Sequence, residues 1–277
     1  YSGNFDIILF MEKNILLTLE YDGSLFHGWQ EQDGQLTVQG RLEEALSLVC
    51  QKPIKVSGTS RTDAGVHALA QCCNFKEDIE IPTDRIARAV NNMLSGGRYG
   101  AGSKVSAIRV LSAEEKPEDF HARFDCKGKK YIYRVCDEGV SVFERNYCYF
   151  VDEKLDVDAM NEACKYLVGT HDFAAFQSAG GNPRKTTVRT ISAAKASRID
   201  KAGGGSEVRI EVCGDGFLYN MVRIITGTLV EIGSGKKVSS DMESIISSVD
   251  RKQAGHTAPP CGLYLAEIYF EDLFDQE

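Results

Sequence analysis

The sequence predicts an α+β fold in two halves, with a mixed or antiparallel sheet and helices packed on one face. Three observations predict it. Runs of alternating apolar residues, typical of half-buried strands, are interleaved with runs in which apolar residues recur every three or four positions, as in helices. Many connections are short enough for hairpins, which favours antiparallel pairing. A strand–helix–strand rhythm occurs in both halves of the 277-residue chain.

The first half is predicted to contain three strands and two helices. Strands are indicated where apolar residues alternate or cluster beside turn residues, and helices where they recur behind a residue that can cap the first turn. Thr37 and Thr83 are the expected caps. In chain order, the elements are expected at 15–21, 38–49, 54–56, 70–75 and 83–94. The buried stripe of the second helix is expected to be Ile86, Val90, Met93 and Leu94.

The second half continues the alternation after a glycine-rich run at 95–102. We interpret that run as a surface loop, because it lacks the Lys-Ser/Thr ending of a phosphate-binding loop. Tyr131, Tyr133 and Val135 are predicted to share one face of a strand, and Gly169 to end a helix. In chain order, the elements are expected at 105–111, around 131–135, and at 157–168, 208–212, 217–232 and 263–270.

Domain organisation follows from length and from where the elements fall. We expect an N-terminal half at 11–112 and a C-terminal half at 113–277. Residues 1–10 are expected to be a non-native or disordered extension, because Met11 resembles a natural start and the apolar run Phe5–Phe10 is too short for a secretory signal. No apolar run approaches the length of a membrane span.

Charge and cysteine usage narrow the class of partner. The net charge is −8, but the basic residues are clustered, and a segregated basic surface on an acidic protein can still bind phosphates. The alternative is a solvated face. The two clusters are Arg123, Lys127, Lys129, Lys130 and Arg134, and Arg184, Lys185 and Arg189. The nine cysteines lack metal-ligand or redox spacing, so we expect reduced thiols, a cytoplasmic protein and no metal.

The run Gly58–Ala68 holds a cation, a carboxylate, glycine and a histidine within a few residues, without apolar periodicity. Arg61 lies two positions before Asp63, and an arginine beside a carboxylate keeps it ionised and oriented. A carboxylate held in this way can act as nucleophile or general base. The alternative is an ordinary surface turn, because Gly, Ser, Thr and Asp are turn residues. This run alone does not decide between the two.

Two other segments carry charged residues in apolar surroundings. In Phe217–Gly227, Arg223 lies on an otherwise apolar helix and needs an anionic partner, for which Asp63 is a candidate. In Lys129–Arg134, basic residues alternate with tyrosines, as in a platform for phosphates and bases. An amphipathic strand with half-buried tyrosines is the alternative there.

Six short motifs in a fixed order identify a resemblance over about residues 14–270. They are Tyr21–Ser24 with His27–Gln30, Arg61–Ala68, His121–Phe124, Lys130–Arg134, Met221–Arg223 and Gly262–Leu265. The chain resembles the TruA family of tRNA pseudouridine synthases. One departure is Ser60, where many members have glycine; we expect the serine to be tolerated.

The resemblance implies an isomerase that converts uridine to pseudouridine at positions 38–40, in the anticodon arm of tRNA. It also implies a homodimer, no metal or organic cofactor, and two related α+β halves with a sheet running through both and a basic active-site cleft between them. Asp63 matches the catalytic aspartate, Tyr131 the tyrosine that packs on the target base, and Arg223 the residue that pairs with the aspartate and would keep it ionised. Arg61 matches an arginine that helps to hold the flipped nucleotide out, and Leu263 an apolar residue of the pocket.

Two alternatives belong to other functional classes. A catalytically silent RNA-binding protein of the same fold would need Asp63, Tyr131 or Arg223 altered, and all three are present. A hydrolase could use Asp63 as a nucleophile on a sugar, but glycosidases usually need a second carboxylate nearby, and no sequence signature supplies one.

Overall fold

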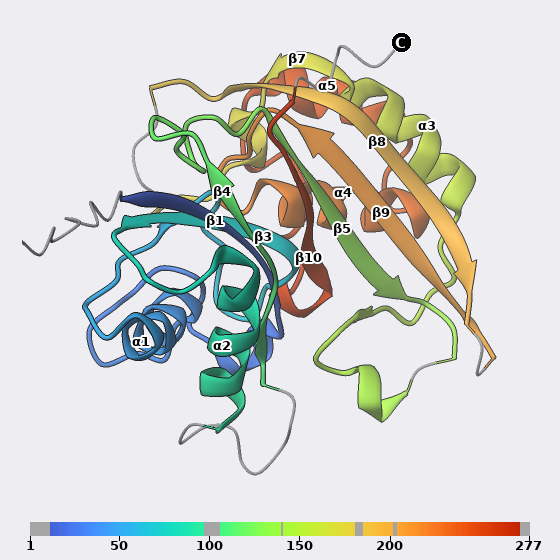
Figure 1. Ribbon diagram of the computed structural model, residues 1–277. Helices are drawn as coiled ribbons and strands as arrows, with labels where there is room; N and C mark the ends of the chain where they lie inside the picture. The colour runs from blue at the N-terminus through green and yellow to red at the C-terminus, as the bar shows by residue number, and fades with distance from the viewer. Residues whose placement is uncertain (1–11, 97–105, 140, 181–184, 202–203, 272–277) are drawn as a thin grey trace, which may run out of the picture.

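The computed structural model describes residues 12–96, 106–139, 141–180, 185–201 and 204–271. Within these residues the strands form one ten-stranded sheet in the order β4-β1-β3-β10-β5-β9-β8-β7, with β2 paired to β3 and β6 to β5 (Figure 1). Most neighbours are antiparallel, whereas β10 runs parallel to β3 and β6 parallel to β5. The predicted α+β class with a mixed sheet is confirmed.

The N-terminal elements agree in kind with the prediction. Thr37 caps α1, accepting a hydrogen bond from the Gly40 N–H, as its position before an apolar helical stripe indicated. The elements are β1 (Lys13–Tyr21), α1 (Val38–Cys50), β2 (Ser57–Gly58), β3 (His67–Glu77), α2 (Thr83–Gly96) and β4 (Ile108–Lys116).

The C-terminal elements include some that the sequence did not predict, namely β6, β7, β8 and α5. They are β5 (Gly128–Cys136), β6 (Tyr149–Phe150), α3 (Val157–Leu167), β7 (Gly169–Asp172), β8 (Val188–Asp200), β9 (Ser206–Gly214), α4 (Met221–Gly233), α5 (Asp241–Ser248) and β10 (Leu263–Tyr269). Tyr131, Tyr133 and Val135 are all buried, which confirms their common strand face.

The last strand of the chain joins the two parts of the sheet. On one side β10 pairs with β3, through Tyr264 with His67 and Leu265 with Ala68. On the other side it pairs antiparallel with β5, which starts the second set of strands. In Figure 1, β10 runs between β3 and β5. Within the described residues, the N-terminal strands are therefore joined to the remaining C-terminal strands only through β10.

One continuous core lies against the sheet. Directly paired residues of neighbouring strands point to the same face. Leu17 of β1 pairs with Cys73 of β3, and Tyr131 of β5 pairs with both Leu265 of β10 and Val212 of β9. All five are buried in the same cluster, together with the apolar stripes of the helices. The helices cover the sheet in two groups, α1 with α2 and α3 with α4 and α5 (Figure 1).

Several element boundaries and one buried position differ from the prediction. The strand expected at 54–56 forms three residues later, as β2, and α4 begins at Met221 rather than at 217. Met93 is 43% exposed, because the buried stripe of α2 is narrower than predicted and comprises Ile86, Val90 and Leu94. The proposed extension 1–10 lies outside the described residues, as does most of the run 95–102. Along the described chain, no helix is long and apolar enough to cross a membrane.

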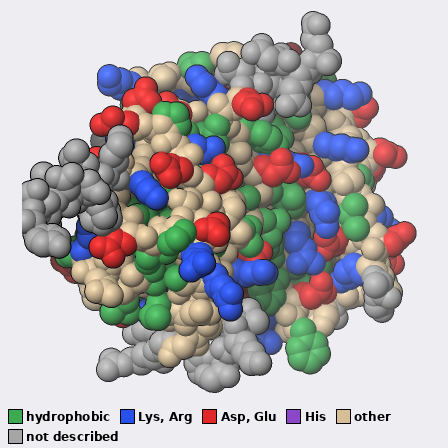
Figure 2. All heavy atoms as spheres, in the orientation of Figure 1, with side chains coloured by type: hydrophobic (Ala, Val, Ile, Leu, Met, Phe, Trp, Pro, Cys, Tyr) green, Lys and Arg blue, Asp and Glu red, His purple; other side chains and the backbone are tan. Residues whose placement is uncertain are grey.

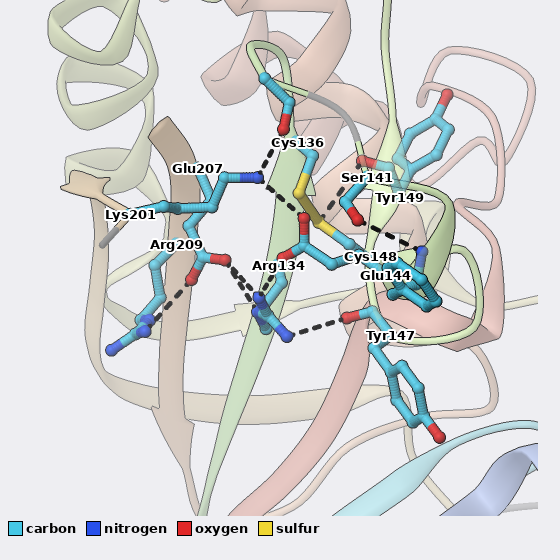
Figure 3. Close-up of polar contacts among 12 residues, drawn as sticks. Arg134, Cys136, Ser141, Glu144, Tyr147, Cys148, Tyr149, Lys201, Glu207 and Arg209 are labelled. Atoms are coloured by element: carbon cyan, nitrogen blue, oxygen red, sulfur yellow. Dashed lines mark hydrogen bonds and ion pairs between the residues drawn. A yellow bond between two sulfur atoms is a disulfide. The ribbon is translucent and has the colours of Figure 1, made fainter. Parts of the chain in front are cut away.

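Two of the nine cysteines form a disulfide, so the prediction of reduced thiols is wrong for this pair. Cys136 ends β5, and Cys148 precedes β6, which pairs with the same end of β5. This pairing brings the two Cα atoms to 6.2 Å, within the range that a disulfide spans. The bond closes the loop between them (Figure 3). Cysteines twelve residues apart without a motif give no sequence signal for such a bond.

Ion pairs fix this disulfide-closed loop to the sheet (Figure 3). Glu144 of the loop accepts hydrogen bonds from Arg134 of β5 at 3.2 Å and from Lys201, just after β8, at 2.9 Å. From the loop, the Tyr147 hydroxyl donates to Asp22 at 2.7 Å. His67 approaches the backbone carbonyl of Asn146 at 3.0 Å. The loop therefore contacts the N-terminal half directly, next to the residues that follow Asp63.

Reduction of the Cys136–Cys148 bond is expected to destabilise the fold. Closing a loop of this length restricts the unfolded chain and stabilises the native state by about 3 kcal/mol. We expect the melting temperature to fall by roughly 5–10 °C when a dithiol reductant is added. The doubly substituted Cys136→Ala, Cys148→Ala protein is the control, because reductant should not shift its melting temperature. A wild-type melting temperature unaffected by reductant would contradict this expectation.

Candidate active site

Sheet topology brings the predicted site residues together. Asp63 lies in the connection from β2 to β3, Leu263 begins β10, and Tyr131 lies in β5. Because β3, β10 and β5 are consecutive in the sheet, these residues face one open hollow of about 880 Å³. Arg223, in the first turn of α4, lines the same hollow, as does Arg61. All five predicted site residues therefore meet, although they come from distant parts of the chain.

The loop carrying Asp63 is held in place by the last residue of β1 and by the segment that follows this strand. The backbone N–H of Trp29 donates to the Thr62 carbonyl at 3.1 Å, and the hydroxyls of Tyr21 and Thr62 are 2.8 Å apart. Gly28 has φ +89°, and a Cβ there would lie 2.7 Å from the Thr62 carbonyl oxygen. Only glycine fits this close approach of two backbones. The loop is thus a fixed platform rather than a surface turn.

Asp63 and Arg223 form the ion pair that sequence could suggest but not show. The Arg223 Nη1 lies 3.4 Å from Asp63 Oδ2, and the two side chains are 16% and 33% exposed. Burial raises the pKa of Asp63, and the charge and hydrogen bond of Arg223 lower it; the net effect is a raised pKa. The arginine therefore opposes, without overcoming, the tendency of the buried carboxyl to bind a proton.

Tyr131 forms an aromatic wall beside Asp63. Its ring packs edge-on against Phe217, with 5.0 Å between centroids, and its hydroxyl lies 3.2 Å from the Ser60 Oγ. Burial raises the pKa of Tyr131 to about 12, so the phenol stays neutral at physiological pH. Ser60 is accommodated as expected, and it also fixes the hydroxyl of the tyrosine.

Leu263 and Arg61 complete the set that was predicted from sequence. Leu263 is buried and pairs with Tyr133 across β10 and β5. It supplies an apolar side chain to the wall of the hollow. The Arg61 side chain is exposed at the hollow. Asp63 and Arg61, although near in sequence, thus differ in environment, and Arg223 rather than Arg61 is the ion-pair partner of Asp63.

The basic cluster predicted around β5 is divided between the two faces of the sheet. Lys129 lies on the hollow side with Tyr131. Lys130 points the other way and pairs with Glu211 at 3.0 Å and Glu267 at 3.4 Å. Arg134 is likewise engaged, with Glu207 and Glu144. Figure 2 shows one face of the molecule, on which basic and acidic side chains are interspersed. The cations that line the hollow are Arg61, Arg123, Lys129, Arg189 and Arg223.

Two further residues in the hollow were not singled out from the sequence. Phe124 is 76% exposed, an unusual state for a phenylalanine, and it lies at the hollow next to Arg123. Its place in the His121–Phe124 motif was a signal that could have been used. Asn220 accepts a hydrogen bond from Arg223 Nη1 at 2.7 Å. It was hidden within a segment predicted to be helical.

The arrangement defines a class of enzyme. Cations around a hollow suit a phosphate backbone, and an exposed aromatic ring beside them suits base stacking. A carboxylate next to an aromatic wall suits chemistry on a base that has left its stack. These features are those of an enzyme that modifies nucleic acid bases.

Comparison with known proteins identifies the family. The family model described as tRNA pseudouridine synthase matches residues 18–125 and 163–271. The two matched segments cover well over half of the chain and include Arg61, Asp63, Arg223 and Leu263, whereas Tyr131 lies between them. The chain belongs to the tRNA pseudouridine synthase family.

Curated relatives extend the similarity over nearly the whole chain. A protein of Clostridium tetani named tRNA pseudouridine synthase A 2 is 44% identical over 263 residues, covering 94% of this chain and 100% of the relative. A protein of Acetivibrio thermocellus named tRNA pseudouridine synthase A is 44% identical over 259 residues, covering 93% of this chain and 100% of the relative.

Proposed function

We propose that the protein converts uridine to pseudouridine at positions 38–40 in the anticodon arm of tRNA, with Asp63 as the catalytic residue. Family membership supports the reaction. The observation that carries the assignment to this site is the meeting of Asp63, Arg223 and Tyr131 in one cation-lined hollow. The catalytically silent alternative has no support, because none of the three is altered or displaced.

The reaction breaks the bond between uracil N1 and ribose C1′, rotates the base and joins C5 to C1′. The proton on C5 is lost to solvent and N1 gains one, so the product is an isomer of the substrate. Asp63 can serve by attack on the nucleoside or by proton abstraction, and both routes require the ionised carboxylate. Arg223 favours that form by its charge. Tyr131, being neutral and buried, offers a ring face rather than a proton acceptor.

Base flipping explains the other groups around the hollow. Removing a base from its stack costs roughly a few kcal/mol. Contact of the flipped uracil with the Tyr131 ring and the Leu263 side chain offsets part of that. Arg61 is exposed at the same hollow, and its proposed role is to contact the displaced nucleotide. The remaining cations suit phosphates of the flanking stem.

The test of the assignment is position mapping. Wild-type protein is incubated with unmodified tRNA transcripts, and pseudouridine is located by chemical adduct formation and primer extension. We expect new pseudouridine at positions 38–40 and none there when those uridines are replaced by cytidine. Pseudouridine confined to another arm of the tRNA would contradict the proposal.

Lys129 and Lys130 provide a matched pair for testing which face binds RNA. Lys129→Ala should weaken tRNA binding and reduce the slope of log affinity against log salt by about 0.7–0.9, as expected for one lost phosphate contact. Lys130→Ala should leave both unchanged, because Lys130 is paired with Glu211 and Glu267 on the opposite face. Equal effects of the two substitutions would show that the hollow is not the RNA-binding face.

The resemblance to the family also supports two further proposals, on the oligomeric state and on the location of the protein. We propose that the protein is a homodimer, which sedimentation equilibrium at micromolar concentration would test. We propose a cytoplasmic location, since tRNA is the substrate. The proposed reaction includes no metal or organic cofactor, because its chemistry needs only a carboxylate and a flipped base.

A further inference from the structure

Asn220 begins α4 with a backbone conformation that helix initiation does not require. It is the N-cap residue and has φ 62° and ψ 8°, in the left-handed region, whereas N-cap residues usually adopt the β region. An asparagine at this position usually accepts a hydrogen bond from an N–H of the first turn. The Asn220 side chain makes no such bond. Capping therefore does not explain this asparagine.

The Asn220 amide instead bridges two segments beside the active site. Its Oδ1 accepts a hydrogen bond from Arg223 Nη1 at 2.7 Å, and its Nδ2 donates to the Ser178 Oγ at 3.0 Å. Ser178 is also bonded to the residue before Asn220, because its backbone N–H donates to the Tyr219 carbonyl at 3.2 Å. Both ends of the amide are thus used, so its orientation is determined.

The contacts of Arg223 show what fixes its position. Two are short: 2.7 Å from Nη1 to Asn220 Oδ1 and 2.7 Å from Nε to the carbonyl oxygen of Ala258. The contact with Asp63 Oδ2 is longer, at 3.4 Å, which is close to the limit of a hydrogen bond. The guanidinium is therefore held by Asn220 and Ala258, and it is presented to Asp63 rather than positioned by it.

We propose that Asn220 is a positioning residue for the reaction: it holds Arg223 where its charge acts on Asp63. The left-handed backbone turns the amide back toward Arg223, three residues later, instead of toward the helix N–H groups. Asparagine adopts this conformation more readily than most residues other than glycine. The inference rests on the proposed roles of Asp63 and Arg223.

Asn220→Gly tests the positioning role of Asn220 most directly, because glycine keeps the left-handed backbone without strain and removes the side-chain amide. Losing a hydrogen bond to a charged group should lower kcat about 10- to 100-fold. KM should change little, since both ends of the amide are engaged within the protein, with Ser178 and Arg223. The acid limb of the pH profile of kcat should move to higher pH, because a displaced Arg223 no longer opposes protonation of Asp63. Gln51→Gly is the matched control: Gln51 also has positive φ, 56°, but lies at the end of α1.

Ser178→Ala supplies a second variant, which removes the partner that orients the amide while leaving Asn220 in place. It should shift the acid limb in the same direction, with a smaller loss of kcat. If Asn220→Gly melts well below Gln51→Gly, Ser178→Ala decides the question by its pH profile. Kinetics of Asn220→Gly that match those of Gln51→Gly, or a raised KM with kcat unchanged, would overturn the inference.

Asp63→Asn, assayed in the same series, separates this inference from the proposed function. An inactive Asp63→Asn protein, together with an Asn220→Gly protein that behaves like the Gln51→Gly control, would contradict only the proposed role of Asn220. An active Asp63→Asn protein would instead remove the proposed catalytic role of Asp63, and the positioning role with it.

Discussion

Asp63→Asn is expected to abolish pseudouridine formation while leaving tRNA binding nearly unchanged. The substitution keeps the size of the side chain but removes the carboxylate that either route requires, so the single-turnover rate should fall at least about 10³-fold. The phosphate contacts are expected from the cations that line the hollow, which this substitution leaves in place. The measurement is nucleoside analysis of tRNA under single-turnover conditions, paired with a binding isotherm.

The same variant should not lose stability at neutral pH. Burial raises the folded-state pKa of Asp63, so the ionised carboxyl destabilises the fold above both its folded and unfolded pKa values, and this penalty disappears below both. Asp63→Asn should therefore melt no lower than wild type near pH 7, and any advantage should vanish below about pH 4. A large fall in melting temperature near pH 7 would mean that lost activity reflects unfolding, and would remove the support for catalysis.

Arg223→Met is expected to lower kcat about 10- to 100-fold at neutral pH, because it removes a charge-assisted hydrogen bond to the reacting carboxylate. The defect should depend on pH. Without the arginine, the already raised pKa of Asp63 moves further up, so the loss should be greatest in acid and should shrink as the pH rises. The pH profile of kcat measures this directly.

Arg223→Lys is the control for charge. Lysine keeps the positive charge but not the planar fork that bonds Asn220, Ala258 and Asp63 together. Its acid limb should therefore lie between those of wild type and Arg223→Met. A defect of Arg223→Met that is the same at every pH would show that the arginine does not tune Asp63.

Elements with a strong apolar pattern could be predicted from the sequence. The alternation in β1, β5, β9 and β10 and the helical stripes of α1 and α3 agree with the structure. Elements without such a pattern could not. Strand β8 is half-exposed along most of its length, so it lacks a clear alternation, and α5 spans only eight residues. The place of β10 between β3 and β5 depends on pairing between distant segments, which periodicity does not encode.

The residues of the candidate site likewise include some that the sequence could predict and one that it could not. Asp63, Tyr131, Arg223, Arg61 and Leu263 could be proposed from motifs, and the structure brings them to one hollow. Opposite faces for Lys129 and Lys130 could also have been inferred, since neighbouring residues of a strand point to opposite sides. The role of Asn220 could not, because it depends on a single backbone conformation and on contacts with Ser178 and Arg223.

The central claim, that Asp63 reacts with a uridine flipped into the hollow, is tested most directly by tritium release. An anticodon-arm substrate carrying [5-³H]uridine at one of positions 38–40 loses tritium to water only when C5 becomes bonded to C1′. Wild-type protein should release the label to completion, and Asp63→Asn protein at equal RNA occupancy should release none above background. Release by Asp63→Asn at a rate comparable to wild type would contradict the assignment.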